Sequence, residues 1–253
     1  MSIFAPRERP ESQDMARLLM HWQGLADTSH CQTTVSMPAP MDVALAASFG
    51  SAHRWALEFS ALASAWGEEP GWILLSYLPS QGRLFNHFAR HPGENWQGAM
   101  AVLALRLNML DAGDRPSSTC ATDLMTQLDW QAVHGRYQKA VHDAAEPWAL
   151  EPEEVGQALC LDVRRAGVYA QATESLAGAH WRDPALVSQW WPELVANAPP
   201  EVLVYCVAGH EMSRGTVLRL RAVGVNARFL RGGMEAWQAR GLPTTAKPKQ
   251  EAE

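Results

Sequence analysis

The sequence predicts an α/β protein, in which a parallel sheet flanked by helices follows a mostly helical segment. Two observations predict this fold class. After Pro147, short apolar runs alternate with segments of helical periodicity, the pattern of βαβ units and a parallel sheet. Before Pro147, apolar residues mostly recur at three- and four-residue steps. The pattern changes at "EPWALEPEE", residues 146–154, so we expect one domain at 1–148 and a second at 149–253.

Composition limits the class of protein. The 253 residues carry a formal net charge of -6 and are 47% hydrophobic, which indicates a folded globular protein and argues against a nucleic-acid partner. No run of about 18 apolar residues is present, so we expect no membrane span. The four cysteines are widely spaced without a C-x-x-C pair, which fits a reducing cytoplasm better than a disulfide framework or a zinc site. We expect no cofactor.

Four segments of the first half have a pattern that predicts secondary structure. Residues 51–66, 95–110 and 122–144 are predicted helices, and the turn "DAGDRP" at 111–116 ends the second of them. The run "WILLSYL", residues 72–78, fits either a buried strand or a short helix. Nothing in this half resembles a known family. It is a candidate for binding a partner, a substrate or a second copy of the chain, as a homodimer.

Histidines and cysteines outside the second domain give weaker signals. His87 and His91 are four residues apart and could share a helix face, but Pro92 follows and no HExxH pattern is present, so we predict no metal site. His30 and Cys31 are sequence neighbours and would point apart in regular structure. Cys31 remains a candidate for a thiol that resolves a reactive cysteine elsewhere.

The second half begins with apolar runs that predict strands. These runs are "ALCLDVR", "EVLVYCV" and "ARFL", at residues 158–164, 201–207 and 227–230. Helices are predicted between them at 183–198 and 213–224. In a parallel sheet, active groups gather at the carboxyl ends of the strands. Of the remaining cysteines, Cys160 is predicted to lie in the core of the first strand, and Cys120 stays open as a resolving thiol.

Cys206 stands at the end of the second of these strands. Gly209 permits a tight turn after it, and a helix follows, with Val217 and Leu220 facing inward and Gly224 at its carboxyl end. Converging backbone N–H groups and the helix dipole favour the thiolate, which is the nucleophilic form of the cysteine. An inert buried cysteine would give the same pattern, so the residues alone leave both interpretations open.

Three motifs in order resemble the rhodanese family. "VYCVAGHEMSRG", residues 204–215, resembles its active-site loop. "LDVRRAGVYAQATESLAGA", residues 161–179, resembles its first strand, with Asp162 and Arg164, and the Gly-Ala turn that follows. "ARFLRGGMEAWQARGLP", residues 227–243, resembles its closing strand and helix, where a Gly-Gly-x-x-x-Trp signature is frequent. The second domain is identified as a member of this family, which implies a rhodanese-like parallel sheet.

The resemblance implies a sulfurtransferase in which Cys206 carries a persulfide between a sulfur donor and a sulfur acceptor. Asp162 and Arg164 would support the strand end. Six positions from Cys206 to Glu211 precede the predicted helix, and this length suits sulfur, whereas phosphatase relatives have a loop one residue longer. The implied substrate-binding residues, which would act through backbone amides, are Val207, Ala208, Gly209, His210, Glu211 and Met212.

The loop departs from the family at two positions. Val207 and Glu211 stand where many active members have an arginine, or a cationic or hydroxyl residue. A carboxylate would repel an anionic donor such as thiosulfate and would disfavour the thiolate. His210 could supply a proton, although a loop residue without chemistry is the simpler interpretation. We therefore expect a donor other than thiosulfate, such as a small-molecule or protein persulfide.

A second interpretation is a rhodanese-fold module that senses oxidant, metal or oxyanion status without catalysis. "GHE" at residues 209–211 and "AGAHWRDPALVSQWW" at 177–191 resemble rhodanese modules attached to bacterial chromate-resistance proteins. That resemblance favours a role in the response to an oxyanion such as chromate. The retained Cys206 favours the enzyme, and the altered loop positions favour the sensor.

Overall fold

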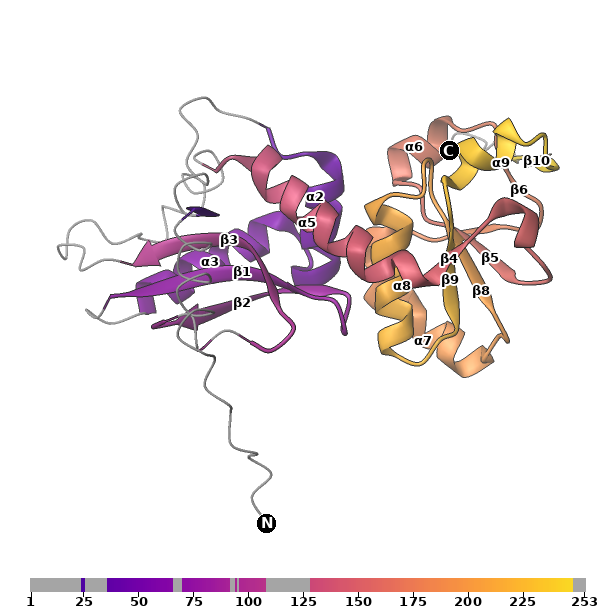
Figure 1. The fold of residues 1–253 in the computed structure, drawn as a ribbon. Coiled ribbons are helices and arrows are strands. Elements are labelled where there is room, and N and C mark those ends of the chain that lie inside the picture. Colours follow the sequence, from indigo (N-terminus) through magenta and orange to yellow (C-terminus); the bar gives the residue numbers. More distant parts are fainter. Residues whose placement is uncertain are drawn as a thin grey trace, which may run out of the picture.

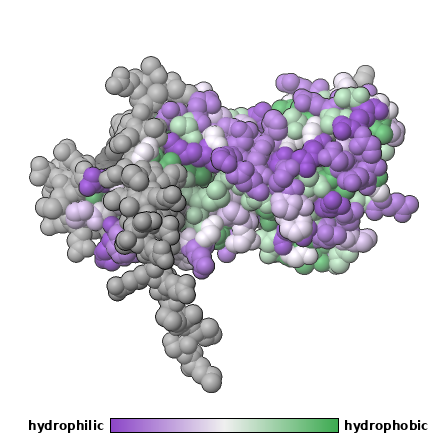
Figure 2. All heavy atoms as spheres, in the orientation of Figure 1, coloured by the Kyte–Doolittle hydropathy of each residue, from purple (hydrophilic) through white to green (hydrophobic). Residues whose placement is uncertain are grey.

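The computed structural model describes residues 24–25, 36–65, 70–91, 94, 96–107 and 128–247. The first half of this region contains a small antiparallel sheet with helices, and the second half contains a parallel sheet between helices (Figure 1). Among the described helices, none is long and apolar enough to cross a membrane. Figure 2 shows hydrophilic residues over much of the visible face of the described part, with hydrophobic residues in small separate groups.

The sheet of the first half has three antiparallel strands in the order β2-β1-β3. These are β1 (Gly71–Leu78), β2 (Arg83–Ala89) and β3 (Met100–Leu107). Helices α2 (Ala39–Phe49), α3 (Ala52–Ala65) and α5 (Trp130–Ala145) accompany the sheet. The helix predicted at 51–66 is confirmed as α3, and the ambiguous run at 72–78 is the central strand β1. Most of the regular structure described in this half is helical, as predicted. The three-stranded sheet was not predicted.

The predicted helix at 95–110 is wrong. Its described part contains β3, which pairs with β1 with Leu75 opposite Leu103 and a shift of register at Val102. Four consecutive residues of β3, 101–104, are buried, so this stretch has no polar face from which a period could be read. This stretch is a strand because it pairs with the central strand β1. Residues 108–116, including the predicted turn, lie outside the described residues.

The helix predicted at 122–144 begins later, at Trp130. The Asp129 carboxylate accepts a hydrogen bond from the Ala132 amide at 3.0 Å, which caps the first turn of α5. Residues 122–127 lie outside the described residues. Helix α5 ends at Ala145 and passes through the 3₁₀ turn Glu146–Trp148 directly into the second sheet.

The second half contains the predicted parallel sheet, with five strands in the order β4-β9-β8-β5-β7. They are β4 (Ala149–Leu150), β5 (Leu159–Asp162), β7 (His180–Trp181), β8 (Val202–Tyr205) and β9 (Ala227–Leu230). The helices are α6 (Ala166–Gln171), α7 (Val187–Asn197), α8 (Glu211–Ala222) and α9 (Gly233–Ala239), with 3₁₀ turns at Pro152–Glu154 and Pro184–Leu186. Strands β6 (Glu174–Leu176) and β10 (Thr244–Ala246) form a separate antiparallel pair.

Side chains of β8 alternate between two apolar clusters. Val202 and Val204 face the cluster that contains Val217 and Leu220 of α8, and Leu203 and Tyr205 face the cluster of α9. The cluster on the α8 side continues into the first half, where its members include Trp55, Phe59, Tyr77 and Trp130. One apolar core therefore extends through both halves, and α5 runs alongside α8 at their junction (Figure 1).

Candidate active site

Cys206 follows β8 directly, at the carboxyl end of a strand that pairs with β5 on one side and β9 on the other. It is a free thiol and only 5% exposed. All four residues of β8 are buried, so the strand fixes where the thiol emerges. This is the edge of a parallel sheet at which functional groups gather.

Helix α8 begins at Glu211, one residue earlier than the loop count from Cys206 to Glu211 placed it and two residues before the predicted range 213–224. His210 is the residue before the helix, and its carbonyl accepts the Arg214 amide at 3.2 Å. Glu211, which the count placed in the loop, is the first helical residue, because a carboxylate is favoured in the first turn of a helix. The amides of residues 212 and 213 precede the first intrahelical bond, so they remain donors at the mouth of the Cys206 loop, whereas the Glu211 amide donates to its own carboxylate.

Glycines let the loop pack tightly against the start of α9. Gly209 has φ +67°, and a Cβ on it would lie 2.7 Å from the Gly232 nitrogen. A Cβ on Gly233 would lie 2.5 Å from the Val207 oxygen and 2.6 Å from the Cys206 oxygen. Because real Cβ atoms do not approach so closely, both positions require glycine. The Gly-Gly motif after β9 is thus a packing surface for the cysteine loop.

The start of α9 also takes up the carbonyl groups of the loop. The Met234 amide donates to the Cys206 oxygen at 2.9 Å, and the Glu235 amide donates to the Val207 oxygen at 3.0 Å. Two loop carbonyls are therefore bonded toward α9 and satisfied there. This fixes the orientation of the two peptide units that follow the thiol.

Ser213 is a site residue that the sequence analysis missed. Its Oγ lies 3.3 Å from Cys206 Sγ and 3.3 Å from the His210 carbonyl oxygen. Its side chain is fully buried. A hydroxyl in this position can accept a hydrogen bond from the thiol and, after rotation of its hydrogen, donate one to the thiolate. The position of Ser213 in the first turn of α8, on the face toward the loop, is the signal that could have found it.

Arg214 is a second residue that the sequence analysis missed. Its Nε donates to the Gly209 carbonyl at 2.8 Å, and its Nη1 donates to the Glu146 carboxylate at 2.7 Å. The guanidinium lies over the Phe229 ring, 4.2 Å from its centroid. Hydrogen bonds from Arg214 and Arg231 lower the pKa of the Glu146 carboxyl. Arg214 therefore ties the cysteine loop to the turn after α5.

The Glu211 carboxylate is bonded to α5. It accepts hydrogen bonds from His134 Nε2 at 3.3 Å and from Gln138 Nε2 at 3.0 Å. Burial opposes ionisation, but the bonds from His134, from the Glu211 amide and from Gln138 outweigh it and lower the pKa of Glu211 to about 2. We expected the Glu211 carboxylate to face a sulfur donor in the loop. It is instead hydrogen-bonded to α5, at the junction of the two halves.

The mouth of the loop carries Val207, His210 and, from α5, His142. Val207 is 37% exposed and His210 is also exposed. The rings of His142 and His210 lie 5.5 Å apart. Burial, and then the charges of Arg214 and His210, lower the pKa of His142, against the opposing effect of Glu211 and Glu146. An element that precedes the parallel sheet therefore contributes a side chain beside the loop.

Asp162 and Arg164 lie at the carboxyl end of β5. Arg164 Nε donates to both Asp162 oxygens, at 3.0 and 2.9 Å, and Arg164 Nη2 reaches the Glu174 carbonyl at 2.9 Å. The Tyr205 hydroxyl donates to Asp162 at 3.0 Å and accepts the Leu176 amide at 3.2 Å. These bonds join β5, β6 and β8 just before Cys206, which is the supporting position that the sequence analysis gave this pair.

The other residues that the sequence singled out lie elsewhere. His87 is buried on β2, with Nε2 2.9 Å from Ser76 Oγ, and His91 lies 3.7 Å from Glu94. Cys160 is half-buried on β5, and burial raises the pKa of its thiol. His30, Cys31 and Cys120 lie outside the described residues. No group of three or more His, Cys, Asp or Glu side chains in the described part is placed to hold a metal ion.

The second half is thus a parallel α/β domain with a cysteine at the carboxyl end of a central strand. Residues 146–240 match the family model of the rhodanese-like domain. This part of the chain is a rhodanese-like domain, as the motifs predicted. The match covers less than half of the chain, and α5, which lies against the cysteine loop, precedes it.

Other comparisons cover smaller shares. The chain is 33% identical over 112 residues to a protein named superoxide dismutase [Fe] of Cupriavidus metallidurans, which is 43% of this chain and 56% of that protein. The match thus spans about half the length of that relative. The iron in its name has no ligand set in the described part of this chain.

The solved structures that are similar to the chain include the following two. One is a protein of unknown function from Rhodopseudomonas palustris, described as a possible tyrosine phosphatase, with 17% identity, a TM-score of 0.38 and coverage of 42% of this chain and 92% of that one. The other is a thiosulfate sulfurtransferase from Pseudomonas aeruginosa, with 24% identity, a TM-score of 0.33 and coverage of 39% and 19%.

Proposed function

We propose that the protein is a sulfurtransferase that carries a persulfide on Cys206. The Cys206 thiolate attacks the outer sulfur of a donor persulfide, R–S–SH. A bond forms between Cys206 Sγ and that sulfur, the S–S bond of the donor breaks, and RS⁻ leaves. An acceptor thiolate then attacks the outer sulfur of the Cys206 persulfide, and Cys206 returns as a thiolate. Both reactions balance, because one sulfur atom moves from a persulfide to a thiolate without net oxidation or reduction.

One observation carries this proposal. In the rhodanese-like domain, the Cys206 thiol faces the start of α8, with Ser213 Oγ 3.3 Å away. The amides of residues 212 and 213 have no intrahelical acceptor, so they can stabilise negative charge on the thiolate and on the outer sulfur. The side chain of Cys206 is otherwise enclosed, which limits competing reactions with water.

We propose that the donor is an organic persulfide and not thiosulfate. The Glu211 carboxylate is hydrogen-bonded to α5, so it is not the group that would exclude thiosulfate. We expect the residues at the mouth of the loop to do so. There Val207 exposes an apolar side chain, and the Arg214 guanidinium is engaged by Gly209 and Glu146. Among the described residues of the loop, none supplies a cation with a permanent charge to meet a dianion.

Intact-protein mass spectrometry tests both parts. After exposure to glutathione persulfide, the chain should gain one sulfur atom, and peptide mapping should place it on Cys206. Cys206→Ser should abolish the gain, whereas Cys160→Ser should keep it, because Cys160 lies on the neighbouring strand with its pKa raised by burial. Thiosulfate at the same concentration should load the chain at least about tenfold more slowly. A sulfur gain that persists in Cys206→Ser would refute the proposal.

A specific contact also favours the sensing alternative. The first residue of α8, Glu211, is bonded to α5, so a change of charge at Cys206 has a direct route into the first half of the chain. As a sensor, the chain would be modified at Cys206 without passing sulfur on. Turnover separates the two functions: release of persulfide to added cysteine supports the enzyme, and a single loading event without release supports the sensor.

A further inference from the structure

A cavity at the junction of the two halves lies away from Cys206. It has a volume of about 340 Å³ and sits between the β1–β2 turn, the start of α7 and the last turn of α8. Figure 1 shows the β1–β2 turn pointing toward the second half of the molecule. Its walls are Gln81, Arg83, Val187, Ser188, Trp191, Arg219, Ala222 and Val223.

Two arginines and no carboxylate line this cavity. Arg219 donates to the Ala47 carbonyl at 3.0 Å and to Ser48 Oγ at 2.7 Å, both neutral acceptors. Arg83 is exposed, and within the described part of the chain it has no hydrogen-bond or ion-pair partner. Burial lowers the pKa of Arg219, and the charge of Arg83 adds a smaller effect in the same direction, against the opposing effect of Tyr137 and Tyr77. Both arginines line the cavity and no carboxylate does, so an anion bound there would supply a counter-charge.

The walls of the cavity are held in place by backbone packing. A Cβ on Gly82 would lie 2.5 Å from the Arg219 nitrogen and 2.8 Å from the Leu218 carbonyl carbon, so the β1–β2 turn lies directly on α8. Arg219 is fixed at its other end by α2, through Ala47 and Ser48. The backbone of the site is therefore preformed, and Arg83 is the side chain that a ligand would order.

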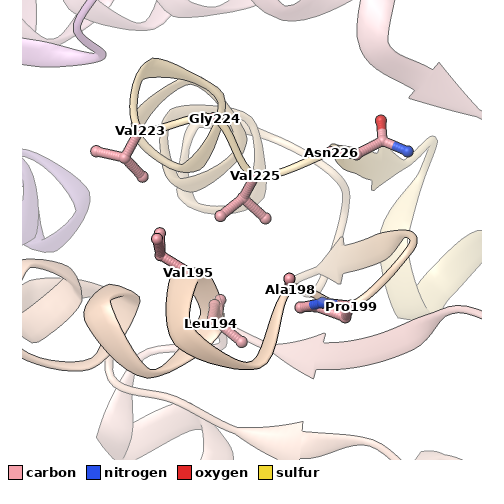
Figure 3. Close-up of a pocket in the computed structure, with 8 residues that line it drawn as sticks. All are labelled: Leu194, Val195, Ala198, Pro199, Val223, Gly224, Val225 and Asn226. Carbon is pink, nitrogen blue, oxygen red and sulfur yellow. The ribbon is translucent and has the colours of Figure 1, made fainter.

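A neighbouring pocket gives a useful contrast. It has a volume of about 160 Å³ and shares Val223 with the arginine cavity. Figure 3 shows Val195, Val223 and Val225 turned toward the space between the end of α7 and the turn after α8. None of its eight lining residues is charged. The arginine cavity differs from this pocket in its two arginines, and its apolar lining comes from Val187, Trp191, Ala222 and Val223.

We propose that the arginine cavity binds a small organic carboxylate with an apolar or aromatic body. The carboxylate would meet Arg83 and Arg219, with hydrogen bonds available from Gln81 and Ser188, and the body would pack on Trp191 and Val187. Arginine suits this ligand because its planar fork matches a carboxylate. On α8, Arg219 lies two turns after Glu211, about 12 Å along the helix axis, so the proposed site is separate from the sulfur-transfer site.

Methyl NMR on the full chain tests this proposal with benzoate as the probe. With ¹³C-labelled valine methyls and constant ionic strength, benzoate should shift the Val187 signals in a saturable way and leave Val207 and Val195 unchanged. Benzamide, a neutral probe of the same shape, should bind at least about tenfold more weakly. Arg83→Gln should weaken benzoate binding by at least about tenfold. Arg106→Gln, the same change at an exposed arginine of β3 outside the cavity, should leave it within about twofold.

Three outcomes would overturn the proposal. They are shifts of Val187 that do not saturate, equal binding of benzoate and benzamide, and unchanged binding in Arg83→Gln. A response of Val195 without Val187 would assign the ligand to the neighbouring apolar pocket instead. Because Arg83 is exposed, its variant should fold, and an unchanged thermal melt checks this. The test needs no sulfur donor, so its result is independent of the function proposed for Cys206.

Discussion

The hydroxyl of Ser213 is the side-chain group that the structure places at hydrogen-bond distance from Cys206 Sγ, at 3.3 Å. Ser213→Ala should slow sulfur loading from glutathione persulfide by about tenfold, which corresponds to about 1.4 kcal/mol of lost transition-state stabilisation. The reason is the loss of a donor to the attacking thiolate. Stopped-flow or quenched loading followed by mass spectrometry measures the rate.

Thr216 is a matched control for that variant. It lies on the same helix with a buried hydroxyl, which donates to the Met212 carbonyl at 2.8 Å. Thr216→Ala removes a hydroxyl from α8 without removing the partner identified for Cys206. Equal rates in the two variants would show that the Ser213 effect is a general loss of helix stability.

At this scale, the motifs gave the positions of residues in the fold, whereas the chemical roles that the motifs imply stay predictions. Cys206, Gly209, Asp162 and Arg164 all stand where the motifs placed them. The orientation of Glu211 could not be predicted, because its partners, His134 and Gln138 on α5, come 77 and 73 residues earlier. A loop motif carries no information about what covers it. Ser213 and Arg214 were missed for a related reason, since their roles depend on the rotation of α8.

Among the structural elements, α9 and the cysteine loop are joined by Gly233. Gly233→Ala should destabilise the chain by at least about 2 kcal/mol, because its Cβ would collide with two loop carbonyls. Gly241→Ala has a similar positive φ, +65° against +57°, but a Cβ there meets nothing within 4 Å. It should lower stability by only about 1 kcal/mol. Urea unfolding measures both, and equal losses would contradict the packing argument.

The contact between α5 and α8 should make stability depend on pH through Glu211. Its pKa is about 2 in the folded chain, below its ordinary value of 4.5, so its stabilisation is complete above about pH 4.5 and is lost as pH falls toward 2. Glu211→Gln should therefore lower the free energy of unfolding by about 2 kcal/mol at pH 7.

Thermal melts between pH 7 and pH 3 check this prediction, because the gap between Glu211→Gln and the parent should narrow below about pH 4.5. Asp143→Asn is the control: it removes an exposed carboxylate of α5 that pairs with Lys139, and it should change stability by less than about 0.5 kcal/mol. A gap that stays constant with pH would mean that the Glu211 charge is not what stabilises the junction.

Elements were predicted well where periodicity or alternation was present. Strands β5, β8 and β9 and helices α3, α7 and α8 were found, because polar residues or turns bound each of these segments in the sequence. The short elements β4, β6, β7, β10 and α6 were not predicted. Strand β3 was not, since its burial on both faces depends on β1 and on helices distant in sequence. The pairing partner of a buried apolar run is tertiary information.

For the whole molecule, the continuous core predicts that the rhodanese-like domain is unstable alone. Residues 150–253 lack α5, which covers α8 and binds Glu211 and Arg214. We expect this fragment to aggregate or to bind a hydrophobic dye, and the full chain to unfold in one transition. A fragment from residue 128, which keeps α5, should be more soluble. A sharp melt of 150–253 at the temperature of the full chain would contradict this expectation.

The close approach of Gly233 to the cysteine loop has a consequence for how such a site could change its chemistry. The backbone of α9 stands where side-chain atoms or a longer loop would need room, and it holds the carbonyls of Cys206 and Val207. The dimensions of the anion cradle are therefore set by an element outside the loop. Widening the cradle for a tetrahedral oxyanion would require a displaced α9 as well as an inserted residue, so substitutions within residues 206–211 alone should not convert this site to phosphate chemistry.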